Sequence, residues 1–535
     1  SAEEMNMLPT ASFFGEKIVC LPGAQDSDLY NLAQIYYKQR QYKRALQTVQ
    51  KARCANADKR FRLLAGQCLA ESKDYEQCLL VLGDEDSDDM LGTDFNSSGH
   101  QVGDGIDTTA GMWLVRASVY DHLQNRVKAA ACYQHAVRRD VKCYQAFDKL
   151  VESHMLSGAD EAALLSELHF TADLEWLKVM YHARCNRYDL SISSPLALPD
   201  QDAMHDGAGG ASQGNAAHQR GTLVLANSVD AKTAVAEALY YHNDFMRCHA
   251  QTEAILAADE FAHSCLPYHL SSLVELKMPR QLFIDAHRLV DSFPESAEAW
   301  YAVACYYYLT QKMEKARFNF LKATTLSPYF APAWVGYGHT FAAQDESDQA
   351  LAAYRTASRF FSGCHVPPLC IGMEYAKTGN LQVSDQFLAH TLTICAMDPL
   401  VYNEIGVLRY LQGNYEEAAQ AFEKGMELSQ AQRAEHHVWH SAEASVFNLG
   451  HCYRKMLRFH EAVEMYTRAL RQAPNKASTY TALAFTHHLM GNFDNAINFY
   501  HKALGISPDD TLTTEMLERA LKDAAENSLA SGLPM

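Results

Sequence analysis

Small and aromatic side chains recur with a fixed spacing in the C-terminal half of the chain. Trp300 and Trp334 lie 34 residues apart, and each is followed 16 positions later by an alanine, Ala316 or Ala350. An aromatic residue stands four positions after each alanine. Apolar residues three and four positions apart share one face of an α-helix. The spacing therefore predicts two helices in every 34 residues, one around the tryptophan and one around the alanine.

The same register recurs along most of the chain. Clear units are expected at 113–136, 371–399, 402–425, 449–474 and 480–508, and more degenerate ones at 32–45, 63–82, 235–257 and 266–293. A helix–turn–helix unit of about 34 residues is typical of the tetratricopeptide repeat. Its copies stack into a superhelix, because each repeat buries its apolar face only against its neighbours. The predicted fold class is therefore all-α, a tetratricopeptide-repeat superhelix, which usually binds polypeptides and rarely carries catalysis.

Two segments without this register divide the chain. Residues 84–109 combine acids with Gly and Ser and are expected to form a flexible acidic loop. Residues 191–221 are rich in Gly, Ala and Gln and are expected to be a disordered linker. The predicted organisation has four parts: an N-terminal repeat array (1–190), the linker, a C-terminal superhelix with a peptide-binding groove (222–512), and a terminal helix and tail (513–535).

Composition narrows the classes of protein that the chain can belong to. It has 46 Lys and Arg against 64 Asp and Glu, a formal net charge of −18, and no run of basic residues. Binding to a phosphate backbone needs concentrated positive charge, so direct contact with nucleic acid is not expected. We see no apolar stretch long enough to cross a membrane and no secretion signal. The 14 cysteines include no CxxC pair, so we expect free thiols and a location in the nucleus and cytoplasm.

Several uninterrupted strings are similar to one family. They are AYRTASRFFSGCHVPPLCIGMEYAKTGN (353–380), DPLVYNEIGVL (398–408), NLGHCYRK (448–455) and STYTALAFTHHLMGNFDNAINFYHKAL (478–504). With the repeat register, they resemble the cell-division-cycle-16 family, tetratricopeptide subunits of the anaphase-promoting complex (cyclosome). The resemblance covers the chain from about Ala11 to Leu521.

The resemblance implies a non-catalytic scaffold inside a ubiquitin ligase that modifies cell-cycle proteins. It implies homodimerisation through the N-terminal repeats and contacts with other tetratricopeptide subunits. It also implies that the C-terminal repeats hold the N-terminal segment of a small subunit of the cell-division-cycle-26 type, whose first residue is an acetylated Met.

The peptide-binding groove is expected along the first helices of the C-terminal repeats. Counting from each signature aromatic residue, the next residue and those near five and eight positions further on face inward. The amides of Asn403 and Asn448 are expected to clamp a peptide backbone, and Arg454 to pair with an acid of the ligand. The predicted groove residues are Tyr301, Cys305, Tyr308, His339, Met373, Asn403, Glu404, Val407, Tyr410, Phe447, Asn448, His451, Arg454, Phe485 and His488.

The start of the chain is expected to be incomplete as a repeat. Phe13 to Cys20 reads as a second helix without its first, so either an upstream helix precedes it or a partner covers it. By the resemblance, this region belongs to the dimer interface. The predicted interface residues are Phe13, Phe14, Leu29, Leu32, Tyr36 and Tyr37.

Enzymatic and metal-binding interpretations find little support. His437 and His440 have helical spacing for a metal but no Cys or carboxylate set beside them. His460-Glu461 begins a zinc-protease motif, yet Glu464 stands where its second His is needed. We therefore expect no catalytic residue, no cofactor and no metal. The alternative function is an adaptor or co-chaperone that binds short peptide motifs, and it needs paired lysines on successive first helices that this sequence lacks.

Overall fold

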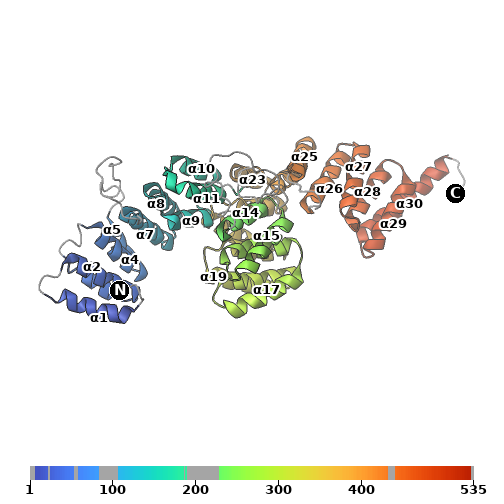
Figure 1. Ribbon diagram of the computed structural model, residues 1–535. Helices are drawn as coiled ribbons and strands as arrows, with labels where there is room; N and C mark the ends of the chain where they lie inside the picture. Colours follow the sequence, from blue (N-terminus) through green and yellow to red (C-terminus); the bar gives the residue numbers. More distant parts are fainter. Residues whose placement is uncertain are drawn as a thin grey trace, which may run out of the picture. The chain divides into compact units, whose positions relative to one another are not determined.

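The computed structural model describes residues 7–21, 25–52, 58–83, 107–185, 187–188, 228–431 and 440–531. Every regular element within these ranges is a helix, as Figure 1 shows. The predicted all-α class, with helices paired as in tetratricopeptide repeats, is confirmed. The predicted linker at 191–221 lies outside the described residues. Of the predicted acidic loop only 107–109 are described, and Asp107 caps the helix that follows by accepting from the Thr109 amide.

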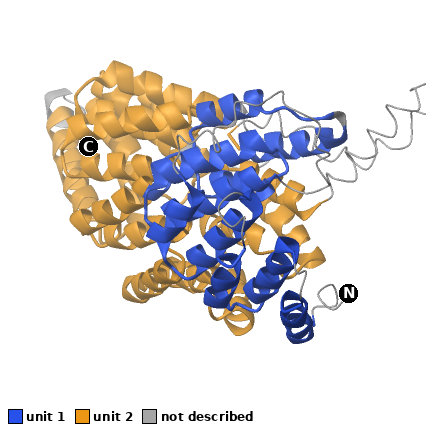
Figure 2. Ribbon diagram, turned by 90° about the vertical axis from the view of Figure 1, so that its left-hand side faces the viewer, with its two compact units in different colours: residues 1–185, 360–363 blue, residues 186–359, 364–535 orange. Residues whose placement is uncertain are grey.

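The chain divides into two compact units, coloured separately in Figure 2. The first comprises residues 1–185 together with 360–363, and the second comprises 186–359 and 364–535. The first unit contains α1 (Leu8–Val19), α2 (Asp26–Lys38), α3 (Tyr42–Val49), α4 (Lys59–Glu71), α5 (Tyr75–Leu82), α7 (Thr108–His122), α8 (Arg126–Arg139), α9 (Tyr144–Glu152), α10 (Gly158–Glu167), the 3-10 helix η1 (Ala172–Leu174) and α11 (Glu175–Cys185).

The second unit begins with α14 and runs to the end of the chain. Its helices are α14 (Val229–Tyr241), α15 (Phe245–Ala258), the 3-10 helix η3 (His263–Cys265), α16 (Leu266–Glu275), α17 (Pro279–Ser292), α18 (Ala297–Leu309), α19 (Met313–Leu326), α20 (Ala331–Ala342), α21 (Ser347–Phe360), α22 (Val366–Lys377), α23 (Leu381–Ile394), α24 (Pro399–Leu411), α25 (Tyr415–Ala431), α26 (His440–Lys455), α27 (Phe459–Gln472), α28 (Ala477–Leu489), α29 (Phe493–Ile506) and α30 (Thr511–Ser531).

A single residue with positive φ turns the chain between the two helices of a repeat. Gln311 and Asp345 have φ of 59° and 60°, and Gly413 and Gly491 have φ of 87° and 76°. A left-handed residue ends a helix within one position, and glycine adopts that conformation without a steric cost. The second helix therefore starts only a few residues after the first one ends and runs back against it.

The first helices of the second unit form one row. Successive first helices α16, α18, α20, α22, α24, α26 and α28 approach one another directly. Second helices such as α19 and α25 instead lie against the first helix of their own repeat and that of the next repeat, α18 and α20 for α19 and α24 and α26 for α25. The row of first helices is thus the more closely spaced side of the stack. We call its solvent-facing surface the inner face.

Glycines in the first helices make room for aromatic rings of the second helices. A Cβ on Gly450 would lie 2.7 Å from Cε1 of Tyr466, and a Cβ on Gly406 would lie 2.6 Å from Cε1 of Phe422. Tyr466 and Phe422 are fully buried. The two helices of these repeats therefore interlock by a small residue that faces a ring, whereas in the α22–α23 repeat Gly372 faces Leu388 instead.

The signature tryptophans each form a hydrogen bond with the turn that follows the preceding repeat. Trp300 Nε1 donates to the carbonyl of Pro294 at 2.8 Å, and Trp334 Nε1 donates to that of Pro328 at 2.9 Å. These carbonyls belong to the turn that leads into each first helix. The same indole hydrogen bond therefore recurs after 34 residues, together with the same packing pattern.

The first unit includes a short segment from far along the chain, residues 360–363, which we call the strap. Arg126 forms an ion pair with Asp121 at 2.6 Å and donates to the Phe360 carbonyl at 2.8 and 3.1 Å. The Gly363 amide donates to the His154 carbonyl at 2.8 Å, and a Cβ at Gly363 would collide with the Leu156 carbonyl. The strap therefore fits only because residue 363 is a glycine.

Some boundaries differ from the prediction. The first described helix begins at Leu8 rather than Phe13, because Pro9 is accepted in the first turn of a helix. The terminal helix α30 spans Thr511–Ser531 and so begins slightly before the expected start at residue 513. Helices α10 and α11 were not predicted, because neither carries the signature spacing of the repeat.

Candidate functional site

Two histidines occupy equivalent places on the inner face, each one position after a glycine. His339 Nδ1 lies 2.8 Å from the Tyr354 hydroxyl, and His451 Nδ1 lies 2.9 Å from the Tyr466 hydroxyl. Burial lowers the pKa of each imidazole to about 4, and for His451 the neighbouring cation of Arg454 lowers it further. Each histidine is therefore neutral near pH 7, and its Nδ1 shares a hydrogen bond with the tyrosine hydroxyl. These two predicted groove residues are partly engaged with their own repeat.

The two asparagines expected to clamp a peptide instead bind each other. Asn403 is buried, and its Oδ1 accepts from Asn448 Nδ2 at 3.2 Å and from the Ser445 hydroxyl at 3.1 Å. Its Nδ2 donates to Glu404 Oε1 at 2.9 Å. The network joins α24 to α26 and fixes the side chains of three predicted groove residues. Their role toward a peptide stays a prediction.

The aromatic residues on α18 lie deeper than expected. Tyr301 and Cys305 are 6% and 3% exposed, and the Tyr301 hydroxyl lies 2.9 Å from Ser271 Oγ. The Tyr301 ring meets Phe330 edge to face with centroids 5.2 Å apart. Burial raises the pKa of the Cys305 thiol to about 12, so the thiol stays protonated. The half-buried Tyr308, three positions further on, presents more of its ring.

The remaining predicted groove residues are at least partly accessible. Met373 is 36% exposed, whereas Val407, Tyr410, Phe447 and Phe485 are half-buried. The Arg454 guanidinium stacks on the Phe485 ring at 5.0 Å and reaches His451. His488 Nε2 lies 2.9 Å from a carboxylate oxygen of Asp523 on α30. Apolar and aromatic surface therefore remains on α22, α24, α26 and α28.

Three carboxyl groups lie on the first helices in the same region. Glu374 on α22 is 6% exposed, and its Oε2 has no hydrogen-bond partner among the described residues. Glu404 on α24 is half-buried and Glu275 on α16 is exposed, and partial loss of hydration raises the pKa of both carboxyl groups. Glu404 belongs to the predicted groove, but Glu275 and Glu374 were missed. The sequence feature that could have indicated them is an acidic residue within an otherwise apolar first helix.

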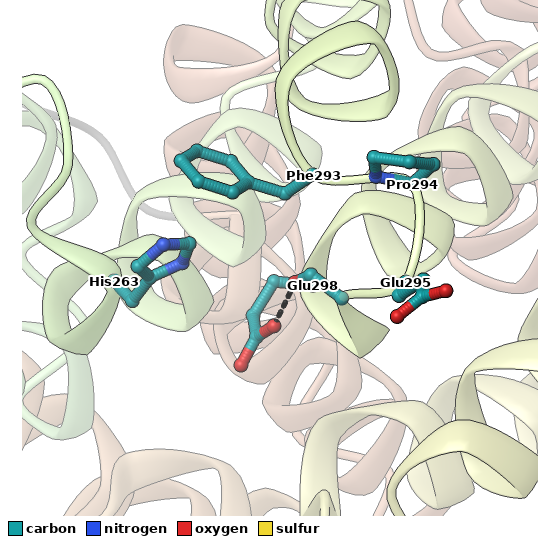
Figure 3. A pocket seen from close by; sticks show the side chains of 6 residues that line it. His263, Phe293, Pro294, Glu295 and Glu298 are labelled. Atoms are coloured by element: carbon teal, nitrogen blue, oxygen red, sulfur yellow. Dashed lines mark hydrogen bonds between the residues drawn. The ribbon is translucent and has the colours of Figure 1, made fainter. Parts of the chain in front are cut away.

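A separate shallow hollow of about 550 Å³ lies at the turn between α17 and α18, shown in Figure 3. Its lining includes Phe293, Pro294 and the carboxylates of Glu295 and Glu298. The His263 ring meets Phe293 edge to face at 4.5 Å between centroids. No predicted site residue lines this hollow.

The predicted dimer residues fall into two groups. Phe13 and Phe14 on α1 are 56% and 58% exposed. Leu29 and Tyr37 are half-buried, while Leu32 and Tyr36 are buried within the unit. The Tyr36 hydroxyl donates to Glu16 at 2.7 Å, which ties α2 to α1. Among the six predicted dimer residues, Phe13 and Phe14 are the ones that offer large exposed apolar surface to a second chain.

The described part of the chain contains no cluster of side chains suited to binding a metal ion. No group of three or more His, Cys, Asp or Glu is placed there to hold a metal ion. The histidines at 436 and 437 lie outside the described ranges.

The cysteines that are described are free thiols, all buried except Cys20. Among the described helices, none is long and apolar enough to cross a membrane.

Stacked helix pairs with an accessible, largely apolar inner face define a tetratricopeptide-repeat scaffold, a class that binds polypeptides. Tetratricopeptide-repeat family models match residues 297–330, 398–475 and 442–509. A model described as anaphase-promoting complex, cyclosome, subunit 3 matches residues 4–85.

Whole-chain comparisons then narrow the class. Anaphase-promoting complex subunit 6 of Arabidopsis thaliana is 39% identical, with 98% of this chain and 96% of that protein covered. The human cell division cycle protein 16 homolog is 34% identical over 96% of this chain and 81% of its own length. The crystal structure of the APC/C hetero-tetramer Cut9-Hcn1 contains a chain with TM-score 0.79 and 30% identity, covering 97% of this chain and 94% of that one.

This chain belongs to the subunit 6 family of the anaphase-promoting complex, which includes cell division cycle protein 16 and Cut9. Its members are non-catalytic tetratricopeptide subunits of a complex that acts in the cell cycle. The predicted family and the prediction that the protein is not an enzyme are confirmed by these relatives.

Proposed function

We propose that this protein is a scaffold in the ubiquitin ligase that holds the N-terminal segment of a small subunit on its inner face. The small subunit is of the Hcn1 or cell-division-cycle-26 type. The observation that carries the proposal is the similarity over 97% of this chain to Cut9, whose crystal structure contains Hcn1. By this proposal the protein works in the nucleus and cytoplasm, where it also contacts other tetratricopeptide subunits and supports ubiquitination of cell-cycle proteins.

The side chains of the inner face suit an extended peptide with an apolar head. Met373, Val407, Tyr410 and Phe447 retain accessible surface on three successive first helices. Aromatic and Met side chains supply large contact area at interfaces. Asn448 Nδ2 donates one hydrogen bond to Asn403 Oδ1, and a peptide amide is expected to compete for these groups.

The substitution Met373→Glu tests the proposal. It places a charge on the accessible inner face, where the free protein can solvate it, and a bound apolar peptide would bury it. We expect the affinity for a purified small subunit of the Hcn1 type, measured by calorimetry, to fall about tenfold or more. The melting temperature of the free protein is expected to change little.

Met397→Glu is the matched control, because Met397 is 47% exposed and precedes α24 instead of lying in a first helix. This variant should bind the small subunit as the parent protein does. Equal affinity of the parent and Met373→Glu proteins would contradict the proposed site.

We also propose that the protein homodimerises through its first unit, with α1 contributing the contact. The exposed Phe13 and Phe14 support this, as does the description of the Cut9-Hcn1 structure as a hetero-tetramer. The rings of Phe13 and Phe14 lie edge to face with centroids 5.5 Å apart, and Ile18 extends the exposed surface by one turn.

A further inference from the structure

The segment from the end of α2 to the start of α4 is strongly basic, unlike the rest of the chain. The whole chain carries a formal charge of −18. Between positions 38 and 62, however, nine residues are Lys or Arg, and Asp58 is the one acid. Protein surfaces usually mix charges of both signs, and a surface of one sign attracts molecules of the opposite sign. The contacts of these cations show which of them are free to attract an acidic molecule.

Three of the cations are compensated within the first unit. Arg44 forms an ion pair with Glu16 at 2.7 Å, and Arg60 forms one with Asp58 at 2.9 Å. Arg62 donates to a backbone carbonyl at the end of α5 at 2.7 Å. A partner molecule would have to compete with these contacts to bind any of the three guanidinium groups.

Arg40, Lys43 and Lys51 have no such contacts. Their side chains are exposed and form no ion pair or hydrogen bond with any residue that the structure describes. Arg40 lies in the turn between α2 and α3, Lys43 in the first turn of α3, and Lys51 just after its end. These three cations can therefore pair with an acid without breaking an existing contact.

The exposed side of α3 brings the free cations together. Ala45 and Val49 are buried, so the opposite side of the helix faces the solvent. Lys43, Gln47 and Lys51 follow one another at intervals of four residues, which places them along that side. At a rise of 1.5 Å per residue, the two lysines are about 12 Å apart along the helix. No acidic residue occurs between positions 39 and 57.

The repeat itself does not require this side of α3 to be basic. Ala45 of α3 and Cys78 of α5 are both completely buried and occupy equivalent places, 33 positions apart. The exposed residue two positions earlier is Lys43 in α3 but Glu76 in α5. The helix dipole favours an acid in the first turn, as in α5. The stability of α3 therefore does not account for a lysine there.

We propose that Arg40, Lys43, Gln47 and Lys51 form a basic face that docks an extended acidic segment of a partner polypeptide. Charge complementarity defines the chemistry of this partner, because the face offers three free cations and no carboxylate. Acids that reach both lysines must lie about 12 Å apart, which is roughly four residues of an extended chain. The Gln47 amide can donate to and accept from the backbone of the segment between them.

The basic face belongs to the first unit, whereas the proposed small-subunit site lies on helices of the second unit. The acidic partner is therefore recognised separately from the small subunit. Its chemistry is also the opposite of an apolar head, since the face has Lys, Arg and Gln side chains exposed.

Zero-length cross-linking of the assembled anaphase-promoting complex tests the proposal. A water-soluble carbodiimide joins a lysine amine to a carboxylate only where the two groups are in contact. The complex is reconstituted with isotope-labelled and unlabelled copies of this protein, and cross-linked peptides are identified by mass spectrometry. We expect Lys43 and Lys51 to be joined to Asp or Glu residues of one acidic segment in another subunit, about four residues apart.

The double variant Lys43→Gln with Lys51→Gln then measures what the face contributes. We expect its affinity for the cross-linked subunit, measured by calorimetry, to fall about five- to tenfold at low salt and less at high salt. Arg280→Gln with Lys312→Gln is the matched control, because it removes two exposed cations from the second unit. Arg280 is the second residue of α17, as Lys43 is of α3. The control should bind as the parent protein does.

Four results would overturn the proposal. Cross-links to the acids at 84–94 of the same chain would identify the protein's own segment as the occupant, and cross-links between labelled and unlabelled copies would identify a second copy. No cross-link, or unchanged affinity in the double variant, would show that the face is only solvated. Binding of a labelled oligonucleotide that the double variant loses, without a cross-link to an acidic segment, would assign the face to nucleic acid.

The proposed function is tested independently of this face. Met373→Glu changes binding of the small subunit, whereas the double Gln variant should leave that binding unchanged. Failure of the basic face therefore leaves the proposed function standing, and failure of the Met373→Glu test leaves the basic face standing.

Discussion

At the scale of single residues, the repeat depends on glycines that face aromatic rings. Gly450 and Gly406 leave room for the rings of Tyr466 and Phe422, which are buried against them. The sequence predicted that small residues stand at such positions, because the spacing repeats. It did not reveal which ring faces which glycine, since that depends on how the two helices of a repeat are placed in space.

The substitution Gly450→Ala tests this arrangement. The new methyl group would lie 2.7 Å from Cε1 of Tyr466, so the ring must move and the fit of α26 against α27 is strained. We expect a loss of about 1–3 kcal/mol in the free energy of unfolding, measured by urea denaturation. Gly505→Ala is the control, because no atom lies within 4 Å of the added Cβ, and helix propensity favours alanine by about 1 kcal/mol. A stabilised Gly450→Ala protein would contradict the tight contact.

At the scale of elements, a histidine on a first helix is paired with a tyrosine on the second helix of the same repeat. The same hydrogen bond occurs in two repeats. It joins His339 to Tyr354 in one and His451 to Tyr466 in the other. The register of the repeat alone predicts both histidines in a groove. It missed the tyrosine partners, because register assigns a face of one helix and says nothing of the side chain that reaches it from another.

These pairs predict acid sensitivity of the second unit. Folding lowers the pKa of both histidines from 6.5 to about 4, so between these values the unfolded chain binds more protons than the folded chain. Stability is therefore full above about pH 6.5 and is lost as the pH falls towards 4. We expect the melting temperature to drop between pH 7 and pH 5.

The double variant His339→Asn with His451→Asn keeps an acceptor near Nδ1 and removes the titrating group. Its melting temperature should fall less between pH 7 and pH 5 than that of the parent protein. His460→Asn changes an exposed histidine and serves as the control. An unchanged pH dependence in the double variant would show that other groups control the acid response.

The helices themselves were predicted where the repeat signature is strong and missed where it is weak. Trp300 and Trp334 marked α18 and α20, because each indole both packs and donates a hydrogen bond to the preceding turn. Helix α10 has no tryptophan, and Trp176 on α11 is 43% exposed and lacks the repeat spacing around it. Glu374 was missed as a site residue, because charge usually indicates an exposed position and only the fold shows that this carboxyl is buried.

At the scale of the whole molecule, the proposed dimer contact depends on α1. Replacing Phe13 and Phe14 with Ser removes exposed apolar surface and leaves the buried Leu32 and Tyr36 in place. We expect the double variant to have the mass of a single chain in light scattering, at concentrations where the parent protein has the mass of two. Phe261→Ser, in the second unit, removes a 64% exposed ring and should leave the dimer intact. A two-chain mass for the double variant would contradict the role of α1.

The strap also has a consequence for the order of events during synthesis. Arg126 and Phe360, whose hydrogen bond completes the first unit, are separated by 234 positions in the chain. At a translation rate of about 5–20 residues per second, the ribosome needs roughly 10 to 50 seconds to make that stretch. During this interval the nascent first unit exposes the His154 and Met155 carbonyls, to which Gly363 and Ser362 of the strap later donate. The amino-terminal half of this scaffold therefore matures late, and chaperones have a defined period in which to protect it.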